Sequence, residues 1–217
     1  MHFIGITVCV DYSDYLAATI DSKLQCCDTL IVATVDSDAA TRQLIEINRR
    51  KHPSNDFKIV DCLLPRTAIV RNEACFNKSH LVSESQSLAY RLCHAESIKN
   101  PAFLLIDADI FLPANARDII IEHATDKEAL YGVERLDFAT PARYHSKIGV
   151  KYRQKFAGYF QLYFEPKHYP AHSIACDKCD VEFASQFKRK VLLPLTVGHI
   201  GPERVNWKGR VSEPWVS

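Results

Sequence analysis

The first half of the chain alternates short apolar runs with segments whose apolar residues recur every three or four positions. Apolar runs predict buried strands, and the longer period predicts helices with one apolar face. The expected strands are 3–10, 29–35, 57–64 and 103–106, and the helices between them are 14–25, 39–51 and 81–95. Ser13 is expected to cap the first helix, and Ser37 or Asp38 the second. This β-α-β-α-β-α-β order favours a mostly parallel sheet with right-handed crossovers.

The second half of the chain has a less regular pattern. Helices are expected over 114–124 and 177–188, and strands over 130–133, 158–164 and 191–197. The segment 137–156 holds many basic and aromatic residues without a clear period, so it is a candidate substrate loop or a solvated loop. No repeat, linker or low-complexity tract divides the chain, and one domain over 1–217 is the simplest interpretation.

The strand expected over 103–106 ends in two aspartates one residue apart, Asp107 and Asp109. An isolated buried carboxylate is very costly, so this pair needs a cation, a hydrogen-bonding ligand or an open cleft. Ligands of open α/β sheets bind outside the carboxyl ends of the strands. We therefore interpret Asp107 and Asp109 as a divalent-metal and ligand site. The alternative is a simple Asx turn that follows the strand.

Composition narrows the classes of function. The 217 residues include 27 Lys and Arg against 26 Asp and Glu, and a formal net charge of +1 gives no general drive toward nucleic acid. No apolar run approaches the length of a membrane span. The segment 1–8 is typical of a first strand rather than of a signal peptide. A cytoplasmic location is therefore expected, in which the eight cysteines stay mostly reduced.

Four segments, taken in order, resemble the GT-A class of nucleotide-sugar glycosyltransferases, such as family 2 and its relatives. They are 4–12, 33–38, 76–78 leading to Asp107-Ala108-Asp109, and 179–183 with His199 further on. The resemblance covers most of the chain. It implies an α/β, Rossmann-related and mostly parallel sheet flanked by helices, with a mixed second half. It also implies a nucleotide-sugar-binding half over 1–112 and an acceptor-binding half over 113–217.

The resemblance implies a metal site. In such enzymes the Asp-x-Asp motif holds Mn²⁺ or Mg²⁺ against the diphosphate of the donor, where the cation stabilises the charge that grows on the leaving group. Asp109 is the implied direct ligand, and Asp107 contacts the ribose or the sugar, or binds the metal through water. His199, flanked by Gly198 and Gly201, is the implied third ligand, which favours manganese. The alternative for His199 is a structural or surface histidine.

The resemblance also implies a nucleotide over the first two strand ends. The backbone of Thr7 and Val8 and the side chain of Asp11 would approach the base. Asp36 would accept from a base N–H, often that of uracil, so a UDP-sugar is favoured. Helix capping is the alternative for Asp36 and for Asp38. The side chains that could reach phosphate or base from the start of the long helix are those of Arg71, Asn77 and Lys78.

An inverting transferase needs a carboxylate that takes the proton from the acceptor hydroxyl. Asp180 is the expected base, because it begins a helical stretch, where an acid suits the helix dipole, and because it aligns with an acidic pair in GT-A enzymes. The sequence departs from that pair at Cys179, where the family often has an acid. Asp177 and Glu182 are the rivals, helix capping is the alternative, and a retaining enzyme needs no such base.

Cys176 and Cys179 form a C-x-x-C motif in the same region. A zinc site with His168 and His172, a redox motif and a chance spacing all remain open at this stage.

Two acceptor classes fit the basic and aromatic residues of the second half: a free or lipid-linked glycan, and a hydroxymethylated pyrimidine in DNA. Small GT-A-like enzymes of phages modify DNA in this way, which would place the protein in a bacterium or a phage-infected cell. The residues are Lys188, Arg189 and Lys190, the group Arg143, Tyr144, Lys147, Lys151, Tyr152, Arg153, Lys155, Phe156 and Tyr159, and the tail 201–210.

Two other functions compete with glycosyl transfer. A nucleotidylyltransferase has a similar layout, but usually a glycine-rich, basic loop after the first strand, and the segment 10–15 has neither glycine nor a basic residue. A non-catalytic sugar- or nucleic-acid-binding module would keep the fold without turnover, and its ligand binding would not depend on metal.

Overall fold

The computed structural model describes residues 1–52, 57–71, 75–139, 143, 149–153, 155–171 and 176–201, with the backbone alone at 70–71, 75–76 and 176–177. The helices are α1 (Ser13–Cys26), α2 (Ala39–Lys51), α3 (Arg66–Ile69), α4 (Lys78–Ala95), α5 (Ala116–His123) and α7 (Cys176–Ser185). The strands are β1 (His2–Val8), β2 (Thr29–Val35), β3 (Lys58–Leu64), β4 (Val70–Arg71), β5 (Cys75–Phe76), β6 (Pro101–Ile106), β7 (Ile110–Phe111), β8 (Leu130–Phe138), β9 (Val150–Lys151), β10 (Phe160–Tyr163) and β11 (Lys190–Ile200).

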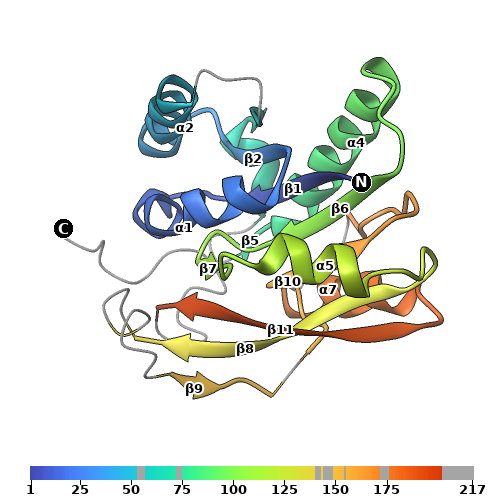
Figure 1. The fold of residues 1–217 in the computed structure, drawn as a ribbon. Coiled ribbons are helices and arrows are strands. Elements are labelled where there is room, and N and C mark those ends of the chain that lie inside the picture. Colours follow the sequence, from blue (N-terminus) through green and yellow to red (C-terminus); the bar gives the residue numbers. More distant parts are fainter. Residues whose placement is uncertain are drawn as a thin grey trace.

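A single sheet joins the two halves of the chain (Figure 1), in the order β3-β2-β1-β6-β10-β8-β11-β7 with β9 beside β8. Strands β3, β2, β1 and β6 are parallel to one another, and β8 is parallel to β11. Strand β10 is antiparallel to both β6 and β8, and β7 is antiparallel to β11. The mostly parallel sheet with a mixed second half that the sequence predicts is therefore confirmed, whereas the division into donor and acceptor halves stays a prediction.

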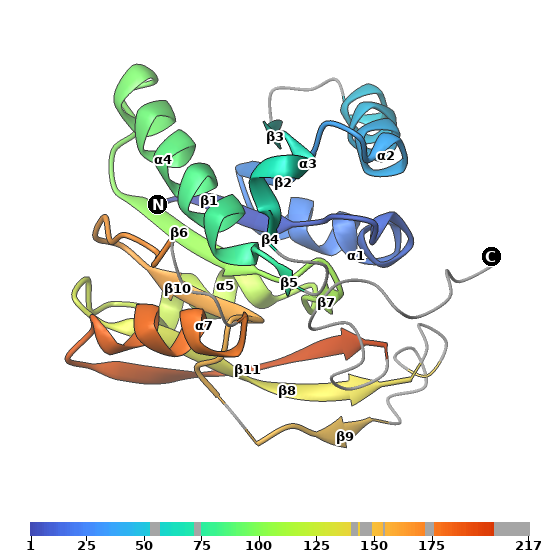
Figure 2. The ribbon, with the colours of Figure 1, turned by 180° about the vertical axis from the view of Figure 1, so that it is seen from behind.

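Helices cover both faces of the sheet because its strands carry apolar residues on both sides. On one face, Leu16 and Ile20 of α1 and Ile45 of α2 pack against Leu30 of β2. On the other face α4 and α7 lie together, as the view from behind shows (Figure 2), and Leu81 belongs to that core. The parallel strands β1, β2 and β6 are thus buried in the middle of a three-layer structure.

The expected elements of the first half are present within a few residues of the expected ends. One expected cap is wrong: Tyr12 caps α1 without a side-chain hydrogen bond, and Ser13 is the first helical residue. Asp38 does cap α2, because its carboxylate accepts from the backbone N–H of Thr41. In the second half, β8 extends to Phe138 and β11 to Ile200, well beyond the expected strands.

Two expectations from composition can be compared with the structure. No helix within the described residues combines the length and apolarity that crossing a bilayer requires. The cysteines whose side chains the structure describes form no disulfide bond, and they are Cys9, Cys26, Cys27, Cys62, Cys93 and Cys179.

Candidate active site

The Asp-Ala-Asp turn lies between β6 and β7, at the carboxyl end of the parallel strands. Its backbone is bonded on several sides. The N–H of Asp107 donates to the carbonyl of Tyr159 (3.3 Å), and the N–H of Ile110 donates back to Asp107 (3.2 Å). The N–H of Ile200, at the end of β11, donates to the carbonyl of Asp109 (3.0 Å). The turn is therefore a fixed structure rather than a loose loop after the strand.

Asp109 and His199 lie side by side at this turn. The Nε2 atom of His199 is 3.2 Å from Oδ2 of Asp109, and its Nδ1 atom is 3.1 Å from Oδ1 of Asp137. The sheet register explains this, because His199 is opposite both Ile110 of β7 and Asp137 of β8. Burial alone would lower the pKa of His199, but the two carboxylates outweigh it and raise the pKa to about 9.

Asp137 is in turn held by Arg135, two residues earlier on β8. The Nε atom of Arg135 lies 2.8 Å from Oδ1 of Asp137, and the guanidinium carbon lies 3.6 Å from the centre of the Tyr152 ring. Burial would raise the pKa of Asp137, but His199 and Arg135 hold it below its usual value. Sequence reasoning missed Arg135 and Asp137, because the expected strand stopped at 133. Arg135 and Asp137 are two residues apart, which places both on one face of a longer strand, and this spacing was the signal that could have found them.

The donor atoms beside Asp109 fit a divalent cation. Oδ1 of Asp109 is buried and, among the described residues, has no hydrogen-bond partner. Carboxylate and imidazole suit Mn²⁺, and metal-binding histidines usually have a carboxylate behind the other ring nitrogen, as Asp137 is here. Within the described part of the chain, no group of three or more His, Cys, Asp or Glu side chains is placed to hold a metal ion by itself. Asp109 and His199 could thus supply two ligands, with substrate and water completing the shell.

Asp107 contacts a lysine rather than His199. The Nζ atom of Lys78 lies 2.5 Å from Oδ1 of Asp107. Burial would lower the pKa of Lys78, but the charges of Asp107 and Asp180 raise it above its usual value, so the side chain stays cationic. Asn77 caps α4 by accepting from the N–H of His80 (3.2 Å). The structure therefore gives the Asn77 side chain a capping role and places the Lys78 side chain beside Asp107.

Asp180 lies on α7. Burial raises the pKa of Asp107, and the nearby charges of Asp109 and Asp180 act in the same direction. Oδ1 of Asp180 accepts a hydrogen bond from the hydroxyl of Tyr169, whose backbone N–H donates to Gln86 (2.8 Å). Gly158 lies directly behind the carboxylate, because a Cβ atom there would be 2.1 Å from its carbon and from both oxygens. Asp180 is thus held between a tyrosine and a glycine that sequence reasoning did not find.

The structure describes only part of the rival acids and of the C-x-x-C motif. Glu182 is exposed on α7, and the side chains of Asp177 and Cys176 lie outside the described residues. Cys179 is buried with its sulfur 3.4 Å from the Tyr169 hydroxyl, and burial raises the pKa of its thiol. His172, a candidate zinc ligand in the sequence, also lies outside the described part of the chain.

The carboxyl ends of β1 and β2 carry a second polar group. Asp11 has a positive φ of 62°, and its carboxylate accepts from both terminal nitrogens of Arg66 at 3.0 and 2.7 Å. The Nε atom of Arg66 donates to the hydroxyl of Ser37 (2.7 Å), and its backbone N–H donates to Oδ1 of Asp36 (3.2 Å). Arg66 links the two predicted base-binding acids. Sequence reasoning missed it because no element was assigned between the expected strand 57–64 and the expected helix 81–95.

The other predicted nucleotide contacts have different surroundings. Asp38 accepts from the N–H of Asp11 (2.8 Å) and from the Thr34 hydroxyl (3.1 Å) besides capping α2, so its role is structural. The Thr7 side chain is buried in β1 and Val8 is half-buried, so a ligand would meet their backbone. The side chain of Arg71 lies outside the described residues.

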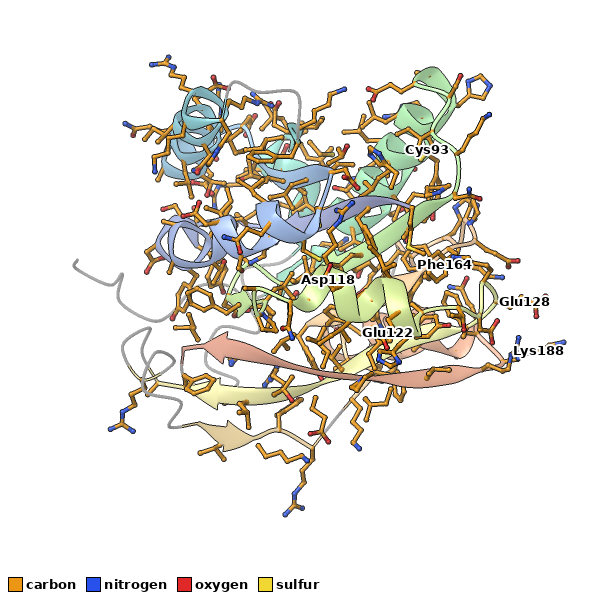
Figure 3. All side chains as sticks on the ribbon, in the orientation of Figure 1. Cys93, Asp118, Glu122, Glu128, Phe164 and Lys188 are labelled. Atoms are coloured by element: carbon orange, nitrogen blue, oxygen red, sulfur yellow. The ribbon has the colours of Figure 1, made fainter. Side chains whose placement is uncertain are left out.

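The basic residues proposed for the acceptor are spread apart. Lys188, Arg189 and Lys190 lie at the amino end of β11, whereas His199 lies at its carboxyl end, and Figure 3 shows Lys188 beside Glu128 at that far edge. Arg189 is paired with Asp126 (2.7 Å). The structure does not bring this cluster to the Asp-Ala-Asp turn. Residues 144–148 and the tail 202–210 lie outside the described part of the chain.

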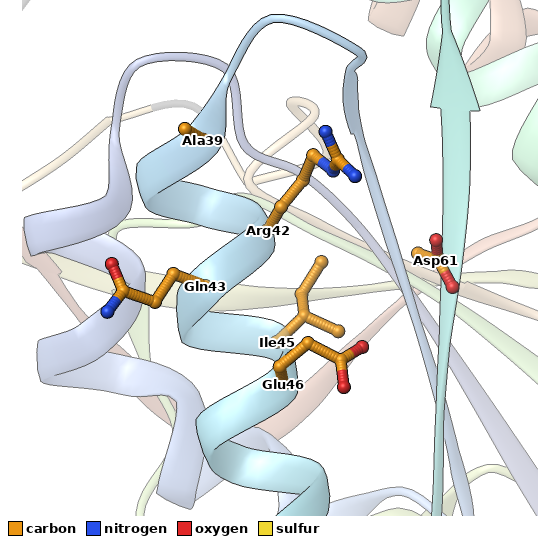
Figure 4. Close-up of a pocket in the computed structure, with 6 residues that line it drawn as sticks. All are labelled: Ala39, Arg42, Gln43, Ile45, Glu46 and Asp61. Carbon is orange, nitrogen blue, oxygen red and sulfur yellow. The ribbon is translucent and has the colours of Figure 1, made fainter.

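A hollow of about 310 Å³ lies elsewhere, between α2 and β3 (Figure 4). Its lining residues are Ala39, Arg42, Gln43, Ile45, Glu46 and Asp61. None of these six lining residues is one that the sequence predicted for the site.

No family model matches the chain, and no curated protein matches it either. Solved structures do share its fold. GalNAc-T7, solved with UDP, GalNAc and Mn²⁺, has a TM-score of 0.61 and 10% identity over 99% of this chain and 46% of its own. A mannosyltransferase from Pyrobaculum calidifontis, solved with GDP-Man and Mn²⁺, has a TM-score of 0.56 and 12% identity over 94% of this chain and 58% of its own.

A putative glucose-1-phosphate thymidylyltransferase from Bacillus anthracis, solved in complex with a sucrose, is also similar. Its TM-score is 0.51 at 10% identity, over 90% of this chain and 88% of its own. The chain thus spans roughly half the length of the two glycosyltransferases (46% and 58%) and most of the thymidylyltransferase. At such identities the comparisons show the fold. The chain has the GT-A-like α/β fold that its sequence predicts.

Proposed function

We propose that this chain is a metal-dependent glycosyltransferase that moves a sugar from a nucleoside-diphosphate donor to an acceptor hydroxyl. The observation that carries the proposal is the contact of Asp109 with His199, backed by Asp137, at the carboxyl ends of the parallel strands. This contact is surrounded by the ammonium of Lys78 and by the carboxylates of Asp107 and Asp180. Two glycosyltransferases of the same fold were solved with Mn²⁺ and nucleotide ligands.

In this proposal Asp109 and His199 hold a divalent cation, Mn²⁺ in preference to Mg²⁺. When bound, the cation stabilises the negative charge that develops on the leaving diphosphate. Asp137 fixes the orientation of the imidazole and keeps Nε2 directed at Asp109. The ammonium of Lys78 supplies a second positive charge to the same diphosphate, and Asp107 contacts the ribose or sugar.

The donor base lies over the ends of β1 and β2 in this proposal. Asp36 and Asp11 offer carboxylate acceptors, and Arg66 fixes both of them through its backbone and its guanidinium. Uracil has one N–H group, at N3, from which a carboxylate can accept a hydrogen bond, so a UDP-sugar is the favoured donor. Asp36, which the sequence predicted to bind the base, thus has a specific neighbour, Arg66.

Asp180 takes the proton of the acceptor hydroxyl as the new bond forms, if the enzyme inverts. Tyr169 and Gly158 hold its carboxylate in one place, which a general base requires. A glycan is the preferred acceptor, because among the described residues Lys151 and Lys155 are paired with Glu134. A hydroxymethylated pyrimidine in DNA is the second acceptor to be tested.

The direct test measures the thermal stability of the chain with UDP, GDP and other nucleoside diphosphates, each with and without Mn²⁺. A shift that needs both UDP and Mn²⁺, and that disappears in Asp109→Ala, is the expected result. The next measurement is the release of UDP from UDP-sugars, which reports their hydrolysis or the transfer of the sugar to a glycan or to hydroxymethylated DNA. Nucleotide binding that is the same with and without Mn²⁺ and in Asp109→Ala would contradict the proposal and favour a non-catalytic binding module.

Nucleotidyl transfer is the second candidate function, since the thymidylyltransferase is matched over 88% of its own length. The segment 10–15 argues against it, because it lacks glycine and basic residues, and Asp11 within it is an acid paired with Arg66. The two reactions release different products. Pyrophosphate formed from a nucleoside triphosphate and a sugar 1-phosphate would show nucleotidyl transfer, whereas release of UDP from a UDP-sugar shows glycosyl transfer.

A further inference from the structure

Lys23 of α1 has no part in the reaction described above, yet its side chain is 0% exposed. It follows Leu16 by seven residues and lies on the apolar face of the helix, where an apolar side chain is expected. Burying an amine removes its hydration, and well-packed apolar residues often replace buried charges without loss of stability. An amine at this position therefore needs partners that an apolar residue would not provide.

Its partners are the backbone carbonyls on either side of Asp109. Nζ of Lys23 donates to the carbonyl of Ala108 (3.2 Å) and to that of Ile110 (2.8 Å). The third contact is with the hydroxyl of Thr19 (2.7 Å), which itself donates to Ala108 (2.5 Å). The turn is thus bound to α1 by three hydrogen bonds from two side chains.

These bonds complete the restraint on the turn. The carbonyl of Asp109 itself accepts from Ile200 of β11, the residue that follows His199. A rotation of the Asp109 backbone would break bonds to both α1 and β11. The Asp109 carboxylate is consequently held 3.2 Å from the imidazole of His199 before any ligand arrives.

The charge of Lys23 is not essential to this restraint. Burial lowers the pKa of Lys23 to about 7, although the carboxylates of Asp109 and Asp107 oppose the change. An ammonium and a neutral amine can both donate two hydrogens, so either form can bond to Ala108 and Ile110.

We propose that Lys23 is a positioning residue that fixes the backbone of Asp109, so that Asp109 and His199 form a preorganised cation site. The inference rests on the metal-dependent function proposed above. A ligand set held in place before binding avoids the entropy cost of ordering it. Loss of Lys23 should therefore weaken the binding of the metal without altering the contacts to the nucleotide base.

The test uses Lys23→Met, which keeps an unbranched side chain and removes the donors. Mn²⁺ affinity is measured by electron paramagnetic resonance in the presence of UDP, and UDP affinity is measured without metal. In Lys23→Met we expect Mn²⁺ to bind at least about tenfold more weakly, which is the usual effect of losing a group that supports a metal ligand. The affinity for UDP without metal should be unchanged. Lys58→Met makes the same change at an exposed lysine of β3, paired with Glu96, and should leave both affinities unchanged.

The outcomes separate the two proposals. A wild-type chain without Mn²⁺-dependent UDP binding would contradict the proposed function, and the role of Lys23 with it. Wild-type binding together with undiminished Mn²⁺ affinity in folded Lys23→Met would overturn the role of Lys23 alone. If that variant does not fold, Thr19→Val decides, because it removes the hydroxyl bonded to Lys23 and Ala108 at nearly equal volume. About fivefold weaker Mn²⁺ binding is then expected, and unchanged binding would overturn the proposal.

Discussion

Gly158→Ala should displace the expected base without touching the metal site. The added Cβ would lie 2.1 Å from the Asp180 carboxylate, whereas side-chain atoms in proteins essentially never approach a Cβ within 3.0 Å. The carboxylate must therefore move by at least 0.9 Å (3.0 minus 2.1) and away from its bond with Tyr169. The φ of Gly158 is not in the left-handed region, so alanine itself adds no backbone strain there.

The expected loss follows from that displacement. A positioned general base contributes about 10²–10⁴-fold, and a misplacement of about 1 Å costs about 10²-fold. We therefore expect kcat to fall about 100-fold, equivalent to about 2.7 kcal/mol in the activation free energy. The three atoms nearest to the added Cβ all belong to Asp180. Donor affinity with Mn²⁺ should therefore change by no more than about twofold, a smaller free-energy difference than the loss of one hydrogen bond.

The assay combines steady-state release of UDP with calorimetric binding of UDP and Mn²⁺, and with urea unfolding of each variant. In the Asp180→Asn background, Gly158→Ala should have no further effect on kcat, because both changes act on one group. Glu182→Gln, on the same helix and exposed, is the matched control and should keep full turnover. A Gly158→Ala variant with kcat near that of the wild type, or an additive loss with Asp180→Asn, would refute the reasoning.

Three further predictions test other parts of the site and fold. Asp137→Asn should weaken Mn²⁺ binding about 10–100-fold, since the carboxylate orients His199, and should leave metal-free UDP binding intact; titration calorimetry of both ligands checks it, and equal Mn²⁺ affinity would count against the assignment. Arg66→Ala should reduce the preference for UDP over other nucleoside diphosphates by releasing Asp11 and Asp36, which competition binding measures; an unchanged preference would remove this residue from the base site. Asp61→Asn should cost less than about 1 kcal/mol in the free energy of unfolding at pH 7, because its ion pair with Arg49 is partly exposed. The hydrogen bond from Arg49 is the largest cause that lowers the pKa of Asp61 below 3.8, so its stabilisation is present above that pH and is lost as the pH falls through the lowered value. Urea unfolding at pH 7 and pH 2.5 checks this, and an equal difference at both would contradict it.

The order of strands and helices could be predicted from the sequence because each element buries residues at its own period. The apolar runs at 29–35 and 103–106 predict strands with both faces covered, and the structure has them in the middle of the sheet. The placement of Asp107 and Asp109 at a strand end follows from the same pattern. Their association with a late histidine came from the resemblance to GT-A enzymes rather than from the period.

Only the tertiary structure decided which side chains face one another. Lys23 meets the turn after β6, some 85 residues away along the chain, because α1 packs beside β7. Asp137 reaches His199 through the register of β8 with β11, and Arg66 reaches Asp11 from the start of α3, which follows β3. A period in the sequence reports which face of an element is buried. It does not predict which residue packs against that face, because long-range packing and strand register determine that partner.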